Sequence, residues 1–207
     1  MIENEIKFLI NSHEYDNLRR TLFTDKNVTS KLQVNYYYDT LNYDLLKKSI
    51  TFRVRQIEDK LVLQVKYPVN IGQTEGKLAL QNKYPINELI RINNEMDMPI
   101  NKIQKTFYLD DEDLKRNIGD LSKYNNVILM GSLVTHRMSL KYNDWMKLDL
   151  DYNLFWGKID YELEIELLNG YESEVNSFID KILLDKNKLN KNMGKAKRFF
   201  YEKQNLE

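Results

Sequence analysis

The chain contains 207 residues, of which 42% are hydrophobic and 30% are charged. This length fits one large domain or two small ones, at roughly 100–200 residues per domain, and the composition excludes a chain that is disordered throughout. The 31 Lys and Arg residues balance the 31 Asp and Glu residues, so we expect no nucleic-acid partner and no acidic membrane bound through bulk positive charge. The absence of cysteine excludes disulfides, zinc–thiolate sites and thiol nucleophiles.

The sequence shows neither a membrane span nor an export signal. No apolar run approaches the ~20 residues of a membrane span, and the chain opens with Met1, Ile2 and Glu3 rather than with a basic region and an apolar stretch. We therefore expect a cytoplasmic protein without a membrane partner. Only seven Gly and three Pro interrupt the chain, and none of them forms a linker-like segment. This favours a single domain over residues 1–207.

Hydrophobic periodicity predicts more strands than helices. Alternation at period two marks the strands, as where Phe52 and Val54 alternate with Arg53 and Arg55. In chain order we expect a strand over 2–10, a helix capped by Ser12, strands over 32–39, 51–55, 61–66 and 76–84, a helix starting at Asp110 or Asp111, strands over 137–141, 147–151 and 162–167, and helices over 172–184 and 195–203. Because no strand–helix–strand rhythm is present, these elements indicate an α+β, β-dominated antiparallel domain with a few flanking helices.

The polar face of the expected sheet carries charges of one sign on each strand. The doublets and the triplet at positions i and i+2 are Glu3/Glu5, Arg53/Arg55, Asp149/Asp151 and Glu162/Glu164/Glu166. Such charges share one face about 7 Å apart, and two carboxylates at that spacing repel each other unless a cation compensates them. If the sheet curls into a closed barrel, its interior is lined by both signs. Such an interior suits a multiply charged anion together with Mg²⁺ or Mn²⁺.

Several of these charged segments resemble motifs of the CYTH family, the triphosphate tunnel metalloenzymes. Glu3-Asn4-Glu5-Ile6-Lys7 is similar to the family's N-terminal Glu-x-Glu-x-Lys signature. Further similar segments follow in the family's order: Tyr37-Tyr38-Asp39-Thr40, Phe52-Arg53-Val54-Arg55, Leu63-Gln64-Val65-Lys66, Thr135-His136-Arg137, Leu148-Asp149-Leu150-Asp151, Asp160-Tyr161-Glu162-Leu163-Glu164-Ile165-Glu166 and Lys195-Ala196-Lys197-Arg198-Phe199. The resemblance covers residues 3 to 199, and the acidic segments are most similar to the bacterial single-domain members of the YjbK type.

The resemblance implies an eight-stranded antiparallel β-barrel that forms a tunnel, in which a triphosphate compound and Mg²⁺ or Mn²⁺ bind. By position, the resemblance assigns Glu3, Glu5, Asp149, Glu162, Glu164 and Glu166 to the metal. It assigns Lys7, Arg53, Arg55, Lys66, Arg137 and Lys195 to the substrate. The residues expected to carry catalysis are Glu3, Glu5, Lys7, Lys66 and Arg137.

The expected activity is metal-dependent hydrolysis of inorganic tripolyphosphate or an organic triphosphate. One segment departs from the family pattern, because Lys77, Ala79, Gln81 and Lys83 stand where further acidic residues are common. This departure supports an alternative, a non-catalytic module that binds a nucleotide or polyphosphate. A second alternative is an adenylyl cyclase of the family's class IV type. The partner is a triphosphate-containing small molecule in each case, and both a monomer and a homodimer remain open.

The two histidines and the tyrosine run are not expected to carry chemistry. His13 lies near a helix start and is expected to be exposed, while His136 points to the face opposite Arg137 by strand period. Two histidines so far apart make a histidine-ligated zinc site improbable. The run of tyrosines at 36–38 is interpreted as strand packing, because no basic patch accompanies it.

Overall fold

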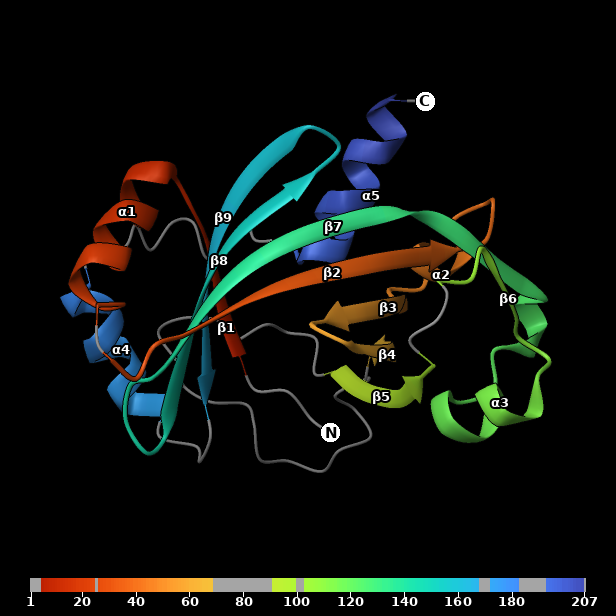
Figure 1. Cartoon of the computed structure of the whole chain (residues 1–207), viewed down its shortest axis with the longest axis horizontal. Helices are drawn as coiled ribbons and strands as arrows, with labels where there is room; N and C mark the ends of the chain where they lie inside the picture. The colour runs from red at the N-terminus through yellow and green to blue at the C-terminus, as the bar shows by residue number, and fades with distance from the viewer. Residues whose placement is uncertain are drawn as a thin grey trace.

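The computed structural model describes residues 5–24, 26–68, 91–99, 103–167, 172–182 and 193–206. Figure 1 shows a curved sheet with helices at its two ends and a C-terminal helix beside the middle strands. The elements are β1 (Glu5–Ile10), α1 (Ser12–Thr21), β2 (Thr29–Asp39), α2 (Asp44–Lys47), β3 (Thr51–Ile57), β4 (Lys60–Pro68), β5 (Arg91–Met98), β6 (Thr106–Tyr108), α3 (Glu112–Ile118), η2 (Ser122–Tyr124), β7 (Asn126–Lys141), β8 (Met146–Phe155), β9 (Lys158–Leu167), α4 (Glu172–Lys181) and α5 (Lys195–Leu206). None of the helices in these ranges combines the length and the hydropathy that a membrane crossing needs.

All paired strands of the sheet are antiparallel, which confirms the expected β-dominated antiparallel fold. The strand order is β1-β9-β8-β7-β2-β3-β4-β5, and β6 pairs with β7. Over the described ranges β1 and β5 form the two edges, so the sheet has nine strands and is open where the sequence predicted a closed eight-stranded barrel. The strands β5 and β6 were not predicted, because Asn93 and Asn94 interrupt apolar alternation in β5 and β6 has only three residues. The strand expected over 76–84 lies outside the described residues.

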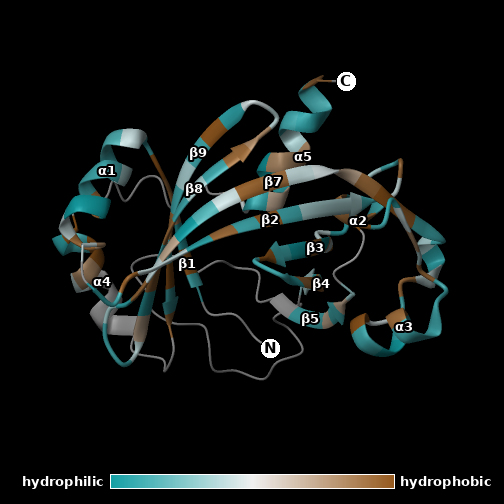
Figure 2. Cartoon of the chain, in the orientation of Figure 1, coloured by the Kyte–Doolittle hydropathy of each residue, from teal (hydrophilic) through white to brown (hydrophobic). Residues whose placement is uncertain are grey.

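At one end of the sheet, α1 and α4 cover the outer side. The apolar positions of β1, among them Ile6 and Phe8, point to this side and pack with Leu18 of α1 and Ile179 of α4. The same core takes in the apolar positions of β8 and β9, where Figure 2 shows polar and apolar residues alternating. Burial of this alternate set leaves the other face of the same strands to the polar residues.

The other end of the sheet is covered by α3. Phe52 and Val54 of β3 and Leu63 of β4 point outward and pack with Leu114 and Ile118 of α3. As a result both ends of the sheet bury apolar residues on the outer side, under helices. We call the opposite side, which carries Lys7, Arg137 and Glu164, the inner face.

The helix starts follow local capping chemistry. Asn11 caps α1: its side chain accepts a hydrogen bond from Glu14 N at 2.9 Å, and the Glu14 carboxylate accepts one from Asn11 N at 2.8 Å. This reciprocal capping box places Ser12, the predicted cap, at the first helical position. Asp111 caps α3, as one of the two predicted starts, and accepts a hydrogen bond from Leu114 N at 3.0 Å.

One end of the inner face is apolar and is covered by α5. Phe199 and Phe200 of this helix pack against Tyr37 of β2 and Leu133 of β7. A register shift between Tyr37 and Tyr38 marks a bulge beside this contact, and bulges increase local twist and bending. The opposing Gly131 has φ +145°, and a Cβ atom there would lie 2.7 Å from Trp156 Cζ2 and 3.0 Å from Phe199 Cζ. Gly131 therefore lets α5 approach the sheet closely.

Candidate active site on the inner face

The charged residues of the inner face come from strands that are far apart in sequence but in register in the sheet. Lys7 of β1 pairs with Glu164 of β9, and Glu164 pairs with Asp149 of β8. One step along the strands, Glu162 pairs with Asp151, and Asp151 pairs with Arg137 of β7. The register therefore sets carboxylates of β8 and β9 opposite one another, and the cations of β1 and β7 on either side compensate them.

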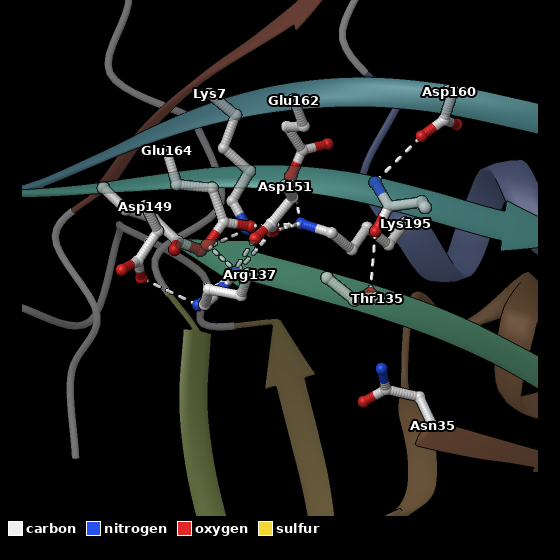
Figure 3. Close-up of polar contacts among 12 residues, drawn as sticks. Lys7, Asn35, Thr135, Arg137, Asp149, Asp151, Asp160, Glu162, Glu164 and Lys195 are labelled. Atoms are coloured by element: carbon white, nitrogen blue, oxygen red, sulfur yellow. Dashed lines mark hydrogen bonds and ion pairs between the residues drawn. The ribbon is translucent and has the colours of Figure 1, made fainter. Parts of the chain in front are cut away.

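Among the described residues, ion pairs join ten residues of the inner face and two of α5 into one set, which we call the charge network. Each member lies within ion-pair distance of at least one other member, and Figure 3 shows the centre of the set. Its seven carboxylates are Glu5, Asp149, Asp151, Asp160, Glu162, Glu164 and Glu166, and its five cations are Lys7, Arg137, Lys147, Lys195 and Arg198. When all members are ionised, the carboxylates exceed the cations by two.

The Lys195 ammonium lies between three buried carboxylates at the centre of the network. Lys195 Nζ is 2.7 Å from Asp151 Oδ2, 2.5 Å from Glu162 Oε1 and 2.6 Å from Glu164 Oε1. Oxygen atoms of the same three carboxylates lie within 4.8 Å of one another. The spacing of the three is that of a cation site, and the side chain of α5 provides the cation (Figure 3).

Arg137 binds the same group of carboxylates from β7. Its Nε and Nη2 atoms donate to the two oxygens of Asp151 at 2.8 and 2.6 Å, a bidentate arrangement. Nη1 donates to Asp149 Oδ2 at 2.7 Å and Nη2 also contacts Glu164 Oε2 at 2.5 Å. Asp149 is held further by the Ser139 hydroxyl, which donates to Oδ1.

The network becomes more exposed toward the start of β1. Lys7 Nζ lies 2.8 Å from Glu5 Oε1 and 3.2 Å from Glu164 Oε1. The side chains of Glu5 and Glu166 are 22% and 45% exposed, whereas those of Asp151 and Glu162 are fully buried. A charged ligand from solution would therefore meet Glu5 and Glu166 first.

The mutual placement of these groups sets their protonation. Burial alone would lower the pKa of Lys195, but Asp151, Glu162 and Glu164 raise it well above the usual value. Burial opposes ionisation of Glu164, yet Arg137, Lys195 and Lys7 hold its pKa well below the usual range. Burial raises the pKa of Glu162, and its attraction to Lys195 and Arg198 offsets only part of this. Of these two carboxylates, Glu162 is therefore the one that accepts a proton more readily.

A second group of cations lies on β3, on the same inner face. Arg53 Nε donates to Gln64 Oε1 at 2.8 Å, and Arg55 Nε donates to Asn35 Oδ1 at 2.9 Å. Among the described residues, no carboxylate forms an ion pair with Arg53 or Arg55. Burial lowers the pKa of Arg55 to about 9, and repulsion from Arg53 and Arg137 contributes to the shift.

The two groups of charges face each other across a strongly curled sheet. Arg137 and Glu164 both act electrostatically on Arg55, although three strands separate β3 from β9 in the sheet. The inner face is therefore concave. It carries an excess of carboxylates on one side and two arginines without carboxylate partners on the other, within the part of the chain that the structure describes.

Most of the predicted site residues come together in these two groups. The structure places Glu5, Lys7, Arg137, Asp149, Glu162, Glu164, Glu166 and Lys195 in the charge network, and Arg53 and Arg55 on the opposite side. Lys66 of β4 lies on the same strand face as Gln64, in register with Thr51 and Asn93. Glu3 and the departing segment with Lys77, Ala79, Gln81 and Lys83 lie outside the described residues.

Sequence reasoning left Asp151, Asp160, Lys147 and Arg198 out of the site. Asp151 shares a strand face with Asp149, and period two alone could have added it. Arg198 lies one helical turn after Lys195, and its guanidinium contacts Asp160 Oδ2 at 2.7 Å and Glu162 Oε2 at 2.7 Å. The signal for Arg198 was its spacing from Lys195 on the expected terminal helix.

The predicted exposure of His13 and the predicted packing of the tyrosines are confirmed. His13 is exposed, while Tyr37 and Tyr38 are buried in the cores. His136 points away from Arg137, and its Nε2 atom lies 2.7 Å from Ser30 Oγ. The charge network therefore remains the candidate site.

Oxygen ligands of the network fit a hard divalent cation. Carboxylates are the ligands that Mg²⁺ and Mn²⁺ prefer, and the network holds two more carboxylates than cations. The carboxylates nearest to solvent, Glu5 and Glu166, flank Glu164 and its partner Lys7. The donor set is thus suited to one divalent ion at the exposed end, with Lys195 occupying the buried end.

Comparison with known proteins agrees with this geometry. The family model described as "CYTH domain" matches residues 1–200. YjbK of Bacillus subtilis (strain 168), provisionally named a triphosphatase, is 26% identical over 175 residues, which are 83% of this chain and 80% of that protein.

Two solved structures have a similar fold. A protein of Bacillus halodurans, provisionally named an adenylate cyclase, gives a TM-score of 0.64 at 21% identity, covering 96% of this chain and 97% of its own. HpAC1 of Hippeastrum gives 0.66 at 17% identity, covering 97% of this chain and 96% of its own, and its structure is described as revealing a dominant triphosphatase activity. At these identities the two structures support the fold alone.

Proposed function

Because this chain belongs to the CYTH domain family, we propose that it hydrolyses triphosphate compounds, with a divalent metal ion bound on its inner face. The relative named as a triphosphatase matches four fifths of the chain, which supports this reaction class. Inorganic tripolyphosphate and organic triphosphates are the proposed substrates, and Mg²⁺ or Mn²⁺ is the proposed metal.

The charge distribution across the concave face carries the proposal. On one side, seven carboxylates exceed five cations, and on the other side Arg53 and Arg55 lack carboxylate partners among the described residues. A polyphosphate bound between the two sides would bring negative charge to the arginines, and its accompanying divalent ion would offset the excess of carboxylates. The polyphosphate and its divalent ion would thus together balance the arginines on one side and the carboxylates on the other.

We assign the roles from these positions. Arg53 and Arg55 hold phosphate oxygens, since guanidinium groups bind phosphate through two parallel donors. Glu5, Glu164 and Glu166 would hold the metal together with Glu3, and Lys66 would bind the polyphosphate from β4. When bound, a divalent ion neutralises charge on the phosphate oxygens and polarises the bond that breaks.

Lys7 and Arg137 link the two sides of the site in this proposal. Both cations already bind Glu164, so they fix this carboxylate while their charge lies close to an incoming phosphate. Hydrolysis forms a bond between a water oxygen and phosphorus and breaks the P–O bond to the bridging oxygen, which leaves with the phosphate or polyphosphate behind it. A carboxylate of the network takes the proton of the attacking water, because ionised carboxylates are the available proton acceptors there.

Phosphate release with defined substrates tests the proposal. Tripolyphosphate, ATP and thiamine triphosphate would be incubated with Mg²⁺ or Mn²⁺ and wild-type protein, Glu5→Gln or Glu112→Gln. Glu112 is an exposed carboxylate of α3 and serves as the matched control. We expect metal-dependent release that falls at least about 100-fold in Glu5→Gln and is unchanged in Glu112→Gln. Equal release by all three proteins would refute the assignment of the site.

A module that binds polyphosphate without hydrolysis is the second candidate. The position of Lys195 favours it, because the ammonium already compensates the three most closely spaced carboxylates. Metal-dependent binding of tripolyphosphate without phosphate release would support this candidate. Formation of cyclic AMP and pyrophosphate from ATP would instead identify a cyclase.

A further inference from the structure

The Tyr37 hydroxyl is buried and has no hydrogen-bond partner in the part of the chain that the structure describes. Tyr38, which is buried, and Tyr67, which is half-buried, differ from it in this respect. Tyr38 donates to Gln104 O at 2.7 Å, and Tyr67 donates to Ile118 O at 2.6 Å. A buried hydroxyl without a partner destabilises the folded state, because it has lost its hydrogen bonds to water. The Tyr37 hydroxyl therefore needs an explanation that packing alone does not supply.

The backbone places Tyr37 among the residues proposed to bind phosphate. Tyr37 of β2 is the register partner of Arg53 of β3, and two residues earlier Asn35 is the register partner of Arg55. Side chains two residues apart on a strand share one face, so Tyr37 and Asn35 both point to the inner face. Asn35 accepts the Nε–H of Arg55 at 2.9 Å.

Packing from α5 holds the Tyr37 ring in place. The centroid of the ring lies 4.8 Å from that of Phe199 and 5.9 Å from that of Phe200. The ring therefore stays on the face that it shares with Arg53 and Arg55, and the two phenylalanines leave it little room to turn away.

The two arginines have donor groups left for a shared ligand. The hydrogen bonds of Arg53 and Arg55 to other described residues run through Nε, so their terminal amino groups lack partners within the described residues. An anion that accepts from these amino groups would lie close to the Tyr37 hydroxyl. We propose that Tyr37 donates a hydrogen bond to an oxygen of the polyphosphate held by Arg53 and Arg55, a proposal that rests on the proposed function.

This contact adds direction to a site that otherwise binds by charge. A hydroxyl carries no charge, so it does not compete with the metal for the carboxylates. Its single O–H group donates along one direction, which favours one orientation of the phosphate. The substrate would thus supply the partner that the hydroxyl lacks among the described residues. Tyr37 acts here as a substrate-binding residue.

Two adjacent tyrosine-to-phenylalanine variants separate this role from a structural one. Binding of diimidotriphosphate, whose bridging nitrogens resist hydrolysis, would be measured by calorimetry in Mg²⁺ for wild type, Tyr37→Phe and Tyr38→Phe. We expect the Kd to rise about tenfold or more in Tyr37→Phe and to be unchanged in Tyr38→Phe. The melting temperature should be equal or higher in Tyr37→Phe and lower in Tyr38→Phe, where a satisfied hydrogen bond is lost.

Other results would overturn the inference. An unchanged Kd in Tyr37→Phe would show that the hydroxyl does not touch the ligand. A melting temperature that falls as far as in Tyr38→Phe would show that the hydroxyl has a structural partner. Arg55→Ala distinguishes this failure from failure of the proposed function. If Arg55→Ala weakens binding while Tyr37→Phe does not, only the inference fails, and if wild type does not bind the analogue, both fail.

Discussion

Lys195, the first residue of α5, places its Nζ atom 2.6 Å from Glu164 Oε1 on β9. The C-terminal helix thereby supplies the cation at the centre of the sheet's acidic side. Removing one partner from a buried ion-pair group leaves the others uncompensated, which typically costs more than the pair itself contributes. The stability of the charge network should therefore depend on Lys195 more than on any surface lysine.

Lys195→Met should destabilise the protein by about 3–5 kcal/mol in a metal-free buffer. Mg²⁺ or Mn²⁺ should recover part of this loss, because a divalent ion could then take the place of the ammonium among Asp151, Glu162 and Glu164. Guanidinium denaturation with and without metal measures both effects. Lys197→Met, two residues away and without a resolved ion pair in the described chain, is the control and should stay near wild type. A metal response of equal size in both variants would contradict the prediction.

Binding of a triphosphate should weaken at alkaline pH through Arg55. The pKa of Arg55 is lowered from 12.5 to about 9 by burial, Arg53 and Arg137, and the anion binds the charged form. Affinity for diimidotriphosphate should therefore fall by about tenfold between pH 8 and pH 10. Calorimetry at several pH values measures this, and Arg55→Gln should remove the dependence.

The stability of the free protein should change with the opposite sign over the same range. Because the folded state disfavours the charged Arg55, the unfolded chain binds more protons between about pH 9 and the usual arginine pKa. The Arg55 contribution to the free energy of unfolding thus becomes less unfavourable as the pH rises through 9. If the affinity for diimidotriphosphate stays constant up to pH 10, Arg55 keeps its proton there and both expectations are contradicted.

Arg198→Lys should loosen the attachment of α5. The Arg198 guanidinium contacts both oxygens of Asp160 at 2.7 and 3.3 Å and Glu162 Oε2 at 2.7 Å, and a lysine cannot reproduce this planar fork. We expect a loss of about 2 kcal/mol and faster hydrogen exchange of the α5 amides. Arg116→Lys, at an exposed ion pair with Asp113 on α3, should change stability by less than about 0.5 kcal/mol.

Gly131→Ala should destabilise the contact between α5 and the sheet. A Cβ atom at Gly131 would lie 2.7 Å from Trp156 Cζ2 and 3.0 Å from Phe199 Cζ, and φ is +145°. We expect a loss of about 2–3 kcal/mol in chemical denaturation. Gly157→Ala is the control, since it shares a positive φ of +73° but meets no atom within 4 Å, and it should lose about 1 kcal/mol. Equal losses would mean that α5 does not pack closely on Gly131.

The alternation of residues along single strands determined much of the site in advance. Arg53 and Arg55 had to share a face because side chains on a strand alternate with period two, and the apolar Phe52 and Val54, which alternate with them, had to face the other way. The same rule placed Glu162, Glu164 and Glu166 together. These inferences succeed because they depend only on backbone geometry within one element.

Only the tertiary structure decided which charges meet. Glu164 binds Lys7, Arg137 and Lys195, which come from three other elements, and strand register and the position of α5 set these contacts. The burial of the Tyr37 hydroxyl without a hydrogen-bond partner among the described residues also follows only from the packing of β2, β3 and α5. Period two tells which side of a strand a residue faces, but the partners across that side depend on how the whole sheet curls.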